Sequence, residues 1–355
     1  MLSFTPVALL GAPLGLSDRY EQHMATMQPS NMDSVDVDAF SWREQCLPRH
    51  TTTCCRAWKA KVKKSEELLR LQLDQVPAWL TAVHTPGSSL FDAATSIVAY
   101  DLFEPTWICE AAERLPPKFE VGNGDGPKWV CGVDALATLP DCLVYSLGSN
   151  GDTSFESGIK QRAPRCEIHT FDPTLDKPWQ LESVHAAEAA GWLRFHAVGI
   201  SDVDGTFAIQ DRTFPALSLP SLKRSLSHGT GRHLDLLKVD VEGAEHRMLA
   251  SAEARAELAH VGQLQVELHG HSFNQTLQFM QAAHAAGLRL FSKEPNHWGC
   301  AGSGCVEMSF VSAAHAFRSF VNTHPSCTES DESEQREPME AEEQEGRIKD
   351  EGGAT

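Results

Sequence analysis

Five short apolar runs alternate with helix-length segments containing Ala, Glu and Leu in the second half of the chain. The runs are bounded by turn residues and lie at 142–147, 166–171, 193–198, 234–239 and 264–268. Nearly continuous apolar strands that alternate with helices are typical of a parallel sheet covered by helices on both faces. Two shorter strands are expected after a last helix, at 288–292 and 306–311. The pattern predicts a doubly wound α/β domain over residues 118–322.

The segment before this domain has helical periodicity. Apolar residues recur at three- and four-residue spacings within residues 56–76, and Pro77 is expected to end that helix. A second helix is expected over residues 90–115, closed by Pro116 and Pro117. Residues 56–117 are therefore interpreted as a helical N-terminal extension, and residues 1–55 as a disordered or irregular leader.

Charge and apolar content exclude two classes of protein. The net charge of −18 argues against nucleic acid as a partner, because binding through phosphates needs a basic face. No run approaches the ~18 apolar residues of a membrane-spanning helix, so we expect no integral membrane segment. Residues 328–355 hold eleven acidic and three basic residues, and we expect residues 323–355 to form a disordered acidic tail. The oligomeric state stays open.

The compartment is not fixed by the sequence. Residues 1–16 are apolar but lack a basic start and contain Pro6 and Pro13, which favours an irregular leader over a signal peptide. A soluble cytoplasmic protein is therefore preferred to a secreted one. Ten cysteines are too few for a disulfide scaffold. A Cys109–Cys131 disulfide is the alternative if the chain is secreted, and both residues would be thiols in the cytosol.

Ligands of doubly wound sheets bind beyond the carboxyl ends of the strands, so the residues there are the candidates. The first strand leads into Gly148, Ser149, Asn150 and Gly151, whose glycines permit close approach of a ligand to the backbone. The pattern G-x-G-x-x-G is absent, which disfavours NAD. The second strand ends at Asp172, which could accept both hydroxyls of a ribose. Together these features predict a ligand that carries a nucleoside.

Acidic and basic groups follow the later strands. Asp240 and Glu242 leave the fourth strand on one side, and Glu267 and His269 end the fifth. These four groups are expected to converge on one rim, as bases or as ligands. Other roles stay open, since Glu242 could cap the next helix and His269 could bond a backbone group.

The motifs resemble a known enzyme family. DLLKVDVEGAE at 235–245 is similar to the hallmark of FkbM-type S-adenosylmethionine-dependent methyltransferases. The stretches GDGPKWVCG (124–132), DCLVYSLGSNGDTSFE (141–156), CEIHTFDP (166–173) and FHAVGISDVDG (195–205) resemble the methyltransferase-like protein 24 group. The resemblance covers roughly residues 100–312. It implies a Rossmann-like class I methyltransferase fold, with a seven-stranded, mostly parallel sheet and a reversed last strand.

The resemblance also assigns cofactor contacts. The loop from Gly148 to Gly151 would hold the methionine part of S-adenosylmethionine, and Asp172 would bind the ribose hydroxyls. Gly199, Ser201 and Asp202 would border the adenine, and Asp240 would lie near the sulfonium. One departure is that the loop has fewer glycines than the usual form, with Ser146 near the place of a common acidic residue.

These observations predict a methyltransferase, with O-methylation of a small-molecule or glycan-like acceptor. The catalytic candidates are His269 as the base, with Asp240 or Glu242 orienting it. A metal-free mechanism is preferred to one in which Asp240, Glu242, Glu267 and His269 bind a divalent ion. Two alternatives remain. One is a catalytically inactive nucleoside-binding module with the same fold, and the other, less favoured, is an NAD-dependent oxidoreductase.

Overall fold

The computed structural model describes residues 52–83, 102–116, 127–229, 231–269, 273–296 and 304–323. The predictions for the leader before Thr52 and for the acidic tail after Thr323 lie outside these residues.

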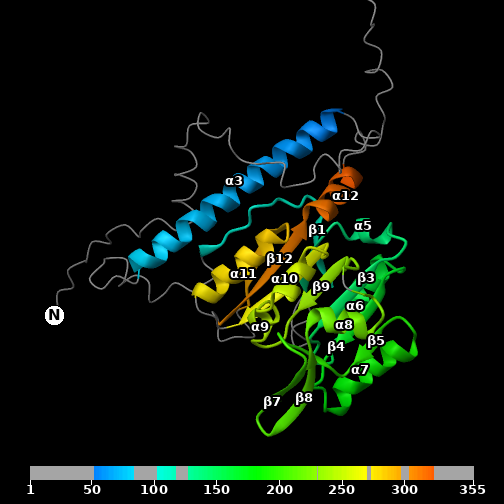
Figure 1. Ribbon diagram of the computed structural model, residues 1–355. Helices are drawn as coiled ribbons and strands as arrows, with labels where there is room; N and C mark the ends of the chain where they lie inside the picture. Colours follow the sequence, from blue (N-terminus) through cyan, green and yellow to red (C-terminus); the bar gives the residue numbers. More distant parts are fainter. Residues whose placement is uncertain are drawn as a thin grey trace, which may run out of the picture.

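The main sheet has seven strands in the order β11-β12-β10-β9-β3-β4-β5 (Figure 1). Their bounds are β3 Leu143–Leu147, β4 Glu167–Phe171, β5 Arg194–His196, β9 Leu236–Val239, β10 Gln263–His269, β11 Leu288–Pro295 and β12 Cys305–Ser312. Neighbouring strands from β5 to β10 pair in parallel, whereas β12 runs antiparallel to both β10 and β11. The predicted fold class, including the reversed last strand, is confirmed.

The prediction that the last two strands are short is wrong. Both β11 and β12 are eight residues long. The polar residues near the end of β11 still pair with β12, since Lys293 lies opposite Met308 and Glu294 lies opposite Glu307. The apolar runs were shorter than the strands because hydrogen bonding of the backbone does not require an apolar side chain at every position.

Helices cover both faces of the sheet. The helices α8 (Leu219–Ser225), α9 (Glu245–Met248), α10 (Ala252–Leu258) and α11 (Phe273–Ala285) border one core, which contains Tyr145 and Leu147 of β3. The helices α5 (Val133–Ala137), α6 (Ser154–Arg162) and α7 (Pro178–Ala189) border the other, which contains Val144. Because successive side chains of a strand point to opposite faces, one apolar run supplies both cores.

The N-terminal helix α3 spans Thr52–Val83, so the prediction that it starts at Arg56 and ends before Pro77 is wrong at both ends. It lies beside α11 and α12 (Ala313–Thr323) at the β11–β12 side of the sheet (Figure 1). Trp58 is fully buried there, with its ring 5.0 Å from that of Phe317. This apolar contact, rather than helix propensity alone, holds α3 on the domain.

The helix expected up to residue 115 is absent from the described residues 102–116. Ala112–Leu115 is instead strand β1, which pairs antiparallel with β2 (Lys128–Cys131). Pro105 interrupts the helical pattern, and the N–H groups of Thr106 and Trp107 both donate to the carbonyl of Leu290 at 3.0 Å. The extension is therefore part helix and part extended chain that packs against β11.

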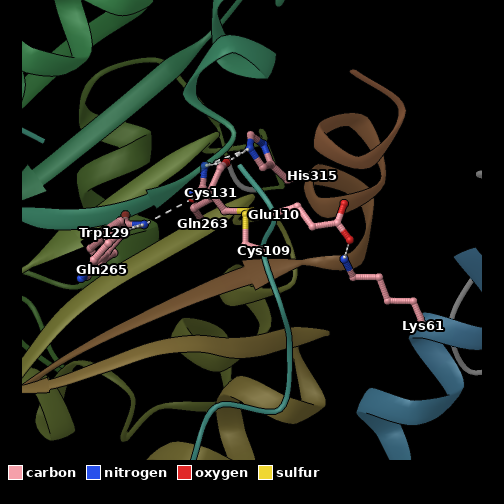
Figure 2. Close-up of a disulfide and its surroundings, with 8 residues drawn as sticks. All are labelled: Lys61, Cys109, Glu110, Trp129, Cys131, Gln263, Gln265 and His315. Atoms are coloured by element: carbon pink, nitrogen blue, oxygen red, sulfur yellow. Dashed lines mark hydrogen bonds and ion pairs between the residues drawn. A yellow bond between two sulfur atoms is a disulfide. The ribbon is translucent and has the colours of Figure 1, made fainter. Parts of the chain in front are cut away.

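A disulfide between Cys109 and Cys131 links this extended segment to β2 (Figure 2). The backbone of Cys131 also exchanges two hydrogen bonds with the Gln263 side chain, at 2.8 and 3.0 Å, and its carbonyl lies 2.9 Å from His315 Nε2. Beside the disulfide, Glu110 accepts a hydrogen bond from Lys61 of α3 at 3.0 Å. These contacts join the extension to the sheet at one place.

A small three-stranded sheet follows β5. It consists of β6 (Gly199–Ile200), β7 (Gly205–Ile209) and β8 (Arg212–Leu217), in the order β6-β8-β7. The residues from Ser201 to Asp204 connect β6 to β7. The β7–β8 hairpin projects from the body of the domain (Figure 1). Across the described residues, no helix is long and apolar enough to cross a membrane.

Candidate functional site

The loop after β3 is packed tightly against its neighbours. Gly148 and Gly151 both have φ of +81°, and a Cβ at Gly148 would lie 1.7 Å from the carbonyl oxygen of Asp240. A Cβ at Gly151 would lie 2.4 Å from Gln180 Cα at the start of α7. Both glycines are therefore required by contacts inside the chain, whether or not a ligand also approaches them.

Asp172 joins the end of β4 to this loop. Its Oδ2 accepts hydrogen bonds from the N–H groups of Ser149 and Asn150 at 3.0 and 2.9 Å, and from Ser149 Oγ at 3.4 Å. Its Oδ1 accepts from the N–H and the hydroxyl of Thr174 at 2.9 and 2.7 Å. The carboxylate is thus saturated by the chain itself. A ribose would fit by replacing the two side-chain hydroxyls, which can rotate away, while the backbone donors stay.

A buried acid lies beneath the loop, although the sequence has Ser146 where an acid is common. Ser146 Oγ donates to Glu156 of α6, and Glu156 is fully buried. Burial raises the pKa of Glu156, and the nearby ammonium of Lys238 opposes that rise. Lys238 also donates to the carbonyl of Gly148 at 2.7 Å. The sequence analysis did not identify Glu156 and Lys238 as site residues. The signal that could have identified them is a polar residue inside a buried strand or helix.

The segment after β5 reaches the same region. A Cβ on Gly199 would lie 2.7 Å from the ring of Phe207, so this position too is closely packed. Ser201 Oγ donates to Asp202 at 2.9 Å, and Arg247 of α9 pairs with the same carboxylate at 3.2 Å. The hydrogen bond from Ser201 lowers the pKa of Asp202. Arg247 therefore connects this segment to the turn that follows β9.

Asp240 belongs to a buried ionic network that the sequence showed only in part. Its Oδ2 lies 3.0 Å from Lys128 Nζ and 3.5 Å from Lys238 Nζ. Lys128 of β2 also pairs with Glu267 at 3.6 Å and with Glu307 of β12. Burial raises the pKa of Glu307 to about 8, against the charge of Lys128. Lys128 and Glu307 were missed because β2 belongs to a separate two-stranded sheet and meets β12 only through tertiary packing.

His269 is held by acidic groups on two sides. Its Nδ1 lies 3.0 Å from Glu245 Oε1, and its Nε2 lies 3.4 Å from Glu242 and 3.9 Å from Glu267. Burial lowers the pKa of the imidazole, but the hydrogen bond and charge of Glu245, with Glu267 and Glu242, raise it to about 9. The ring therefore carries a proton at neutral pH.

The carboxylate that orients His269 through Nδ1 is Glu245, rather than Asp240 or Glu242 as predicted. Glu245 is fully buried, and its Oε1 accepts from the N–H groups of Val241 and Gly243 at 3.3 and 3.1 Å. The turn after β9 thus folds around Glu245. Glu242 has φ of +55° and an 86% exposed side chain, so it projects to the surface beside the Nε2 of His269.

The four predicted rim groups do come together. Ligand atoms of Asp240, Glu242 and His269 lie within 4.8 Å of one another, and such a set could hold a divalent ion. A second set, of Asp240, Glu267 and Glu307, surrounds the ammonium of Lys128, which already supplies the positive charge. The metal-free interpretation stays a prediction.

A model of a family described as "methyltransferase domain" matches residues 82–312, which is more than half of the chain. The chain belongs to this methyltransferase family. The match starts before the predicted boundary at residue 118 and includes β1 and the disulfide-linked segment. It confirms the resemblance that the motifs at 141–156 and 235–245 indicated.

Two curated relatives and one solved structure are similar to this methyltransferase domain. "Probable methyltransferase-like protein 24" is 31% identical in Homo sapiens and 30% in Rattus norvegicus, each over 131 residues. These alignments cover 37% of this chain and 33% of each relative, so they span one third of the relatives' length. The methyltransferase FkbM of Methylobacillus flagellatus has a TM-score of 0.35 at 12% identity, covering 70% of this chain and 61% of that one.

Proposed function

We propose that this chain transfers a methyl group from S-adenosylmethionine to an oxygen atom of a small-molecule or glycan-like acceptor. The observation that carries the proposal is the meeting of the glycine loop, Asp172 and the His269 cluster at one edge of a class I methyltransferase sheet. Ligands of such sheets bind at this edge. Family membership supports methyl transfer, and the acceptor is proposed from the resemblance.

The residues of the loop would bind and orient the donor. The backbone of Gly148, Ser149, Asn150 and Gly151 would border its methionine part, and Asp172 its ribose. Gly199, Ser201 and Asp202 would lie beside its base, with Asp202 fixed by Arg247. Bound S-adenosylmethionine would supply a methyl group already activated by a sulfonium. Positioning of the acceptor would then provide much of the rate acceleration.

His269 is the proposed base for an alcohol acceptor, held in place by Glu245. Because the pKa of His269 is raised to about 9, most rings are protonated at neutral pH. The fraction able to accept a proton grows about tenfold per pH unit below that value, and each neutral ring is a stronger base than an ordinary imidazole. Activity should therefore rise up to about pH 9. Asp240 would act by holding Lys128 and Lys238 beneath the site rather than by moving a proton.

One observation favours the alternative of an inactive binding module. The glycines of the loop are explained by contacts within the chain, and Asp172 is saturated by the chain's own donors. A fold that kept these contacts for stability alone would have the same geometry. Ligand binding and turnover separate the two hypotheses.

Calorimetry on the full chain tests the cofactor. We expect S-adenosylhomocysteine to bind and NAD not to bind, and Asp172→Ala to abolish the heat of binding. Asp176→Ala is the matched control, because Asp176 is a nearby acid whose carboxylate pairs with Arg212 at the surface. Thr174→Val should preserve or strengthen binding, since it removes a hydroxyl that competes for Asp172 Oδ1.

The outcomes separate the hypotheses. Binding of NAD instead would favour the oxidoreductase. Binding of S-adenosylhomocysteine without turnover of any hydroxylated acceptor would favour the inactive module. A folded protein that binds neither ligand would overturn the proposed cofactor.

We also propose that the chain folds in an oxidising compartment, in contrast to the cytoplasmic preference drawn from its leader. Of the seven cysteines in the described residues, six are disulfide-bonded and only Cys55 is free. Cys109–Cys131 and Cys142–Cys166 each join separate segments of the domain. Disulfides persist in oxidising compartments and are rare in the cytosol. A thiol count of the unfolded, unreduced chain from its native source tests this, and free thiols at these four positions would contradict it.

A further inference from the structure

A second cluster of ligating side chains lies on the sheet face that carries Tyr145, away from the rim described above. Glu167 and His169 are two residues apart on β4, so their side chains project from the same face. His228 follows the end of α8 and folds back toward them. His169 is 1% exposed and the His228 side chain 7% exposed, so both imidazoles are buried, whereas the Glu167 side chain is 32% exposed and lies at the solvent side of the cluster.

The three side chains present donor atoms at distances that suit one metal ion. His169 Nε2 lies 3.1 Å from Glu167 Oε1, and His228 Nε2 lies 3.9 Å from the same oxygen. Ligand atoms about 2.0–2.1 Å from a tetrahedral ion are separated by about 3.3 Å. Small rotations of the side chains would therefore bring all three donors to a single ion.

The other nitrogen of each imidazole already has a hydrogen-bond partner. His169 Nδ1 lies 2.9 Å from His196 Nε2, and His228 Nδ1 lies 2.5 Å from the hydroxyl of Tyr145. Metal-bound histidines almost always have such a partner on the second nitrogen, because it fixes the tautomer and the direction of the ring. Here both outer partners leave the Nε2 atoms directed at Glu167.

We propose that Glu167, His169 and His228 bind a zinc ion that fastens the end of α8 to β4. Two imidazoles and one carboxylate form a ligand set that suits Zn²⁺ better than the harder ions Ca²⁺ and Mg²⁺, which take oxygen ligands. This site is independent of the proposed methyl transfer.

Arg194 is the neighbour that opposes the ion most directly, because it pairs with the Glu167 carboxylate itself, whereas the charges of Arg232 and Lys223 act on His228. The guanidinium of Arg194 lies 2.5 Å from Glu167 Oε1, but its side chain is 64% exposed and free to move into solvent. Arg194 would compete with the metal for the carboxylate by charge and by position. Removing it should therefore tighten zinc binding, which a purely structural role for the cluster would not produce.

The test is the zinc content of the purified full chain after dialysis against a weak chelator, measured by elemental analysis. We expect one ion per chain that is lost in His228→Gln and in Glu167→Gln, and kept in the exposed control His185→Gln. Tyr145→Phe should weaken binding about 10-fold, since it removes an outer partner. Arg194→Ala should strengthen binding several-fold, measured by competition with a chromophoric chelator.

Two further measurements keep the proposal testable if the variants of this cluster fold poorly. A strong chelator should lower the melting temperature of the unmodified chain but leave that of His228→Gln unchanged. His269→Gln should keep its zinc, which separates this cluster from the rim. A chain that binds no zinc after refolding with excess Zn²⁺, or zinc that survives both His228→Gln and Glu167→Gln, would overturn the proposal.

Discussion

The Nδ1 atom of His269 lies 3.0 Å from the carboxylate of Glu245, a residue that is completely buried. A buried carboxylate is costly unless it is paired. The imidazolium of His269 and the N–H groups of the turn therefore stabilise Glu245, and Glu245 in turn orients these groups. The pair thus connects the turn after β9 to the end of β10, where the acceptor is proposed to bind.

Replacing Glu245 by Gln should lower the pKa of His269 from about 9 toward the ordinary value near 6.5. The substitution removes the hydrogen-bonded charge that most strongly favours the protonated ring. NMR titration of His269 would measure the change, and the alkaline rise in activity should move to lower pH with it. Glu253→Gln on α10, an exposed position, is the control. A titration midpoint that stays near 9 would contradict this assignment.

The raised pKa of His269 also predicts how stability depends on pH. A group whose pKa is higher in the folded state stabilises it fully below the unfolded value, and this contribution is lost as pH rises through the folded value. We therefore expect the contribution of His269 to decline between about pH 6.5 and pH 9, by on the order of 1–3 kcal/mol. Urea denaturation at several pH values would measure it, as the difference between the unmodified chain and His269→Gln. A difference independent of pH would exclude this effect.

Lys128→Met should destabilise the fold by about 3–5 kcal/mol, because it leaves buried carboxylates without their cation. The side chain is 2% exposed and pairs with Asp240, Glu267 and Glu307. Lys293→Met is the matched control, since its partner Glu104 is 40% exposed and such a pair contributes about 1 kcal/mol or less. Chemical denaturation compares the two. Equal losses would mean that the network contributes no more than a surface ion pair.

Gly148→Ala should cost about 3 kcal/mol more than Gly191→Ala in free energy of unfolding. The two glycines have φ of +81° and +75°, so each alanine substitution carries a similar backbone strain of about 1–2 kcal/mol. A Cβ at Gly191 meets nothing within 4 Å, whereas one at Gly148 collides with the carbonyl of Asp240. Equal losses would show that the loop moves aside, and binding of S-adenosylhomocysteine by the variant would then report whether the site survives.

The sheet could be predicted from the sequence because its strands are buried on both faces and read as continuous apolar runs. Asp172, Asp240 and His269 were found for a related reason: they are polar residues that directly follow such runs. Glu156, Glu245 and Lys128 carry no such signal. Each lies within or near a short or amphipathic element, and only the packing of that element brings it to the site.

The extended segment before β1 was misassigned for a different reason. Its apolar residues recur as they do in a helix, but Phe103 and Trp107 are each buried against the sheet rather than along one helical face. Tertiary contacts overrode local propensity there. The orienting role given to Asp240 failed in a similar way, since spacing along a strand does not reveal that two lysines occupy its carboxylate.

The place of β12 has a consequence for synthesis of the chain. This strand is the last of the sheet in sequence, yet it inserts between β10 and β11 and pairs with both. Until it has left the ribosome, β10 keeps one edge open and β11 has no neighbour in the sheet. An open, apolar strand edge invites pairing with other chains. The nascent protein is therefore expected to stay vulnerable to aggregation until nearly the whole domain has been translated.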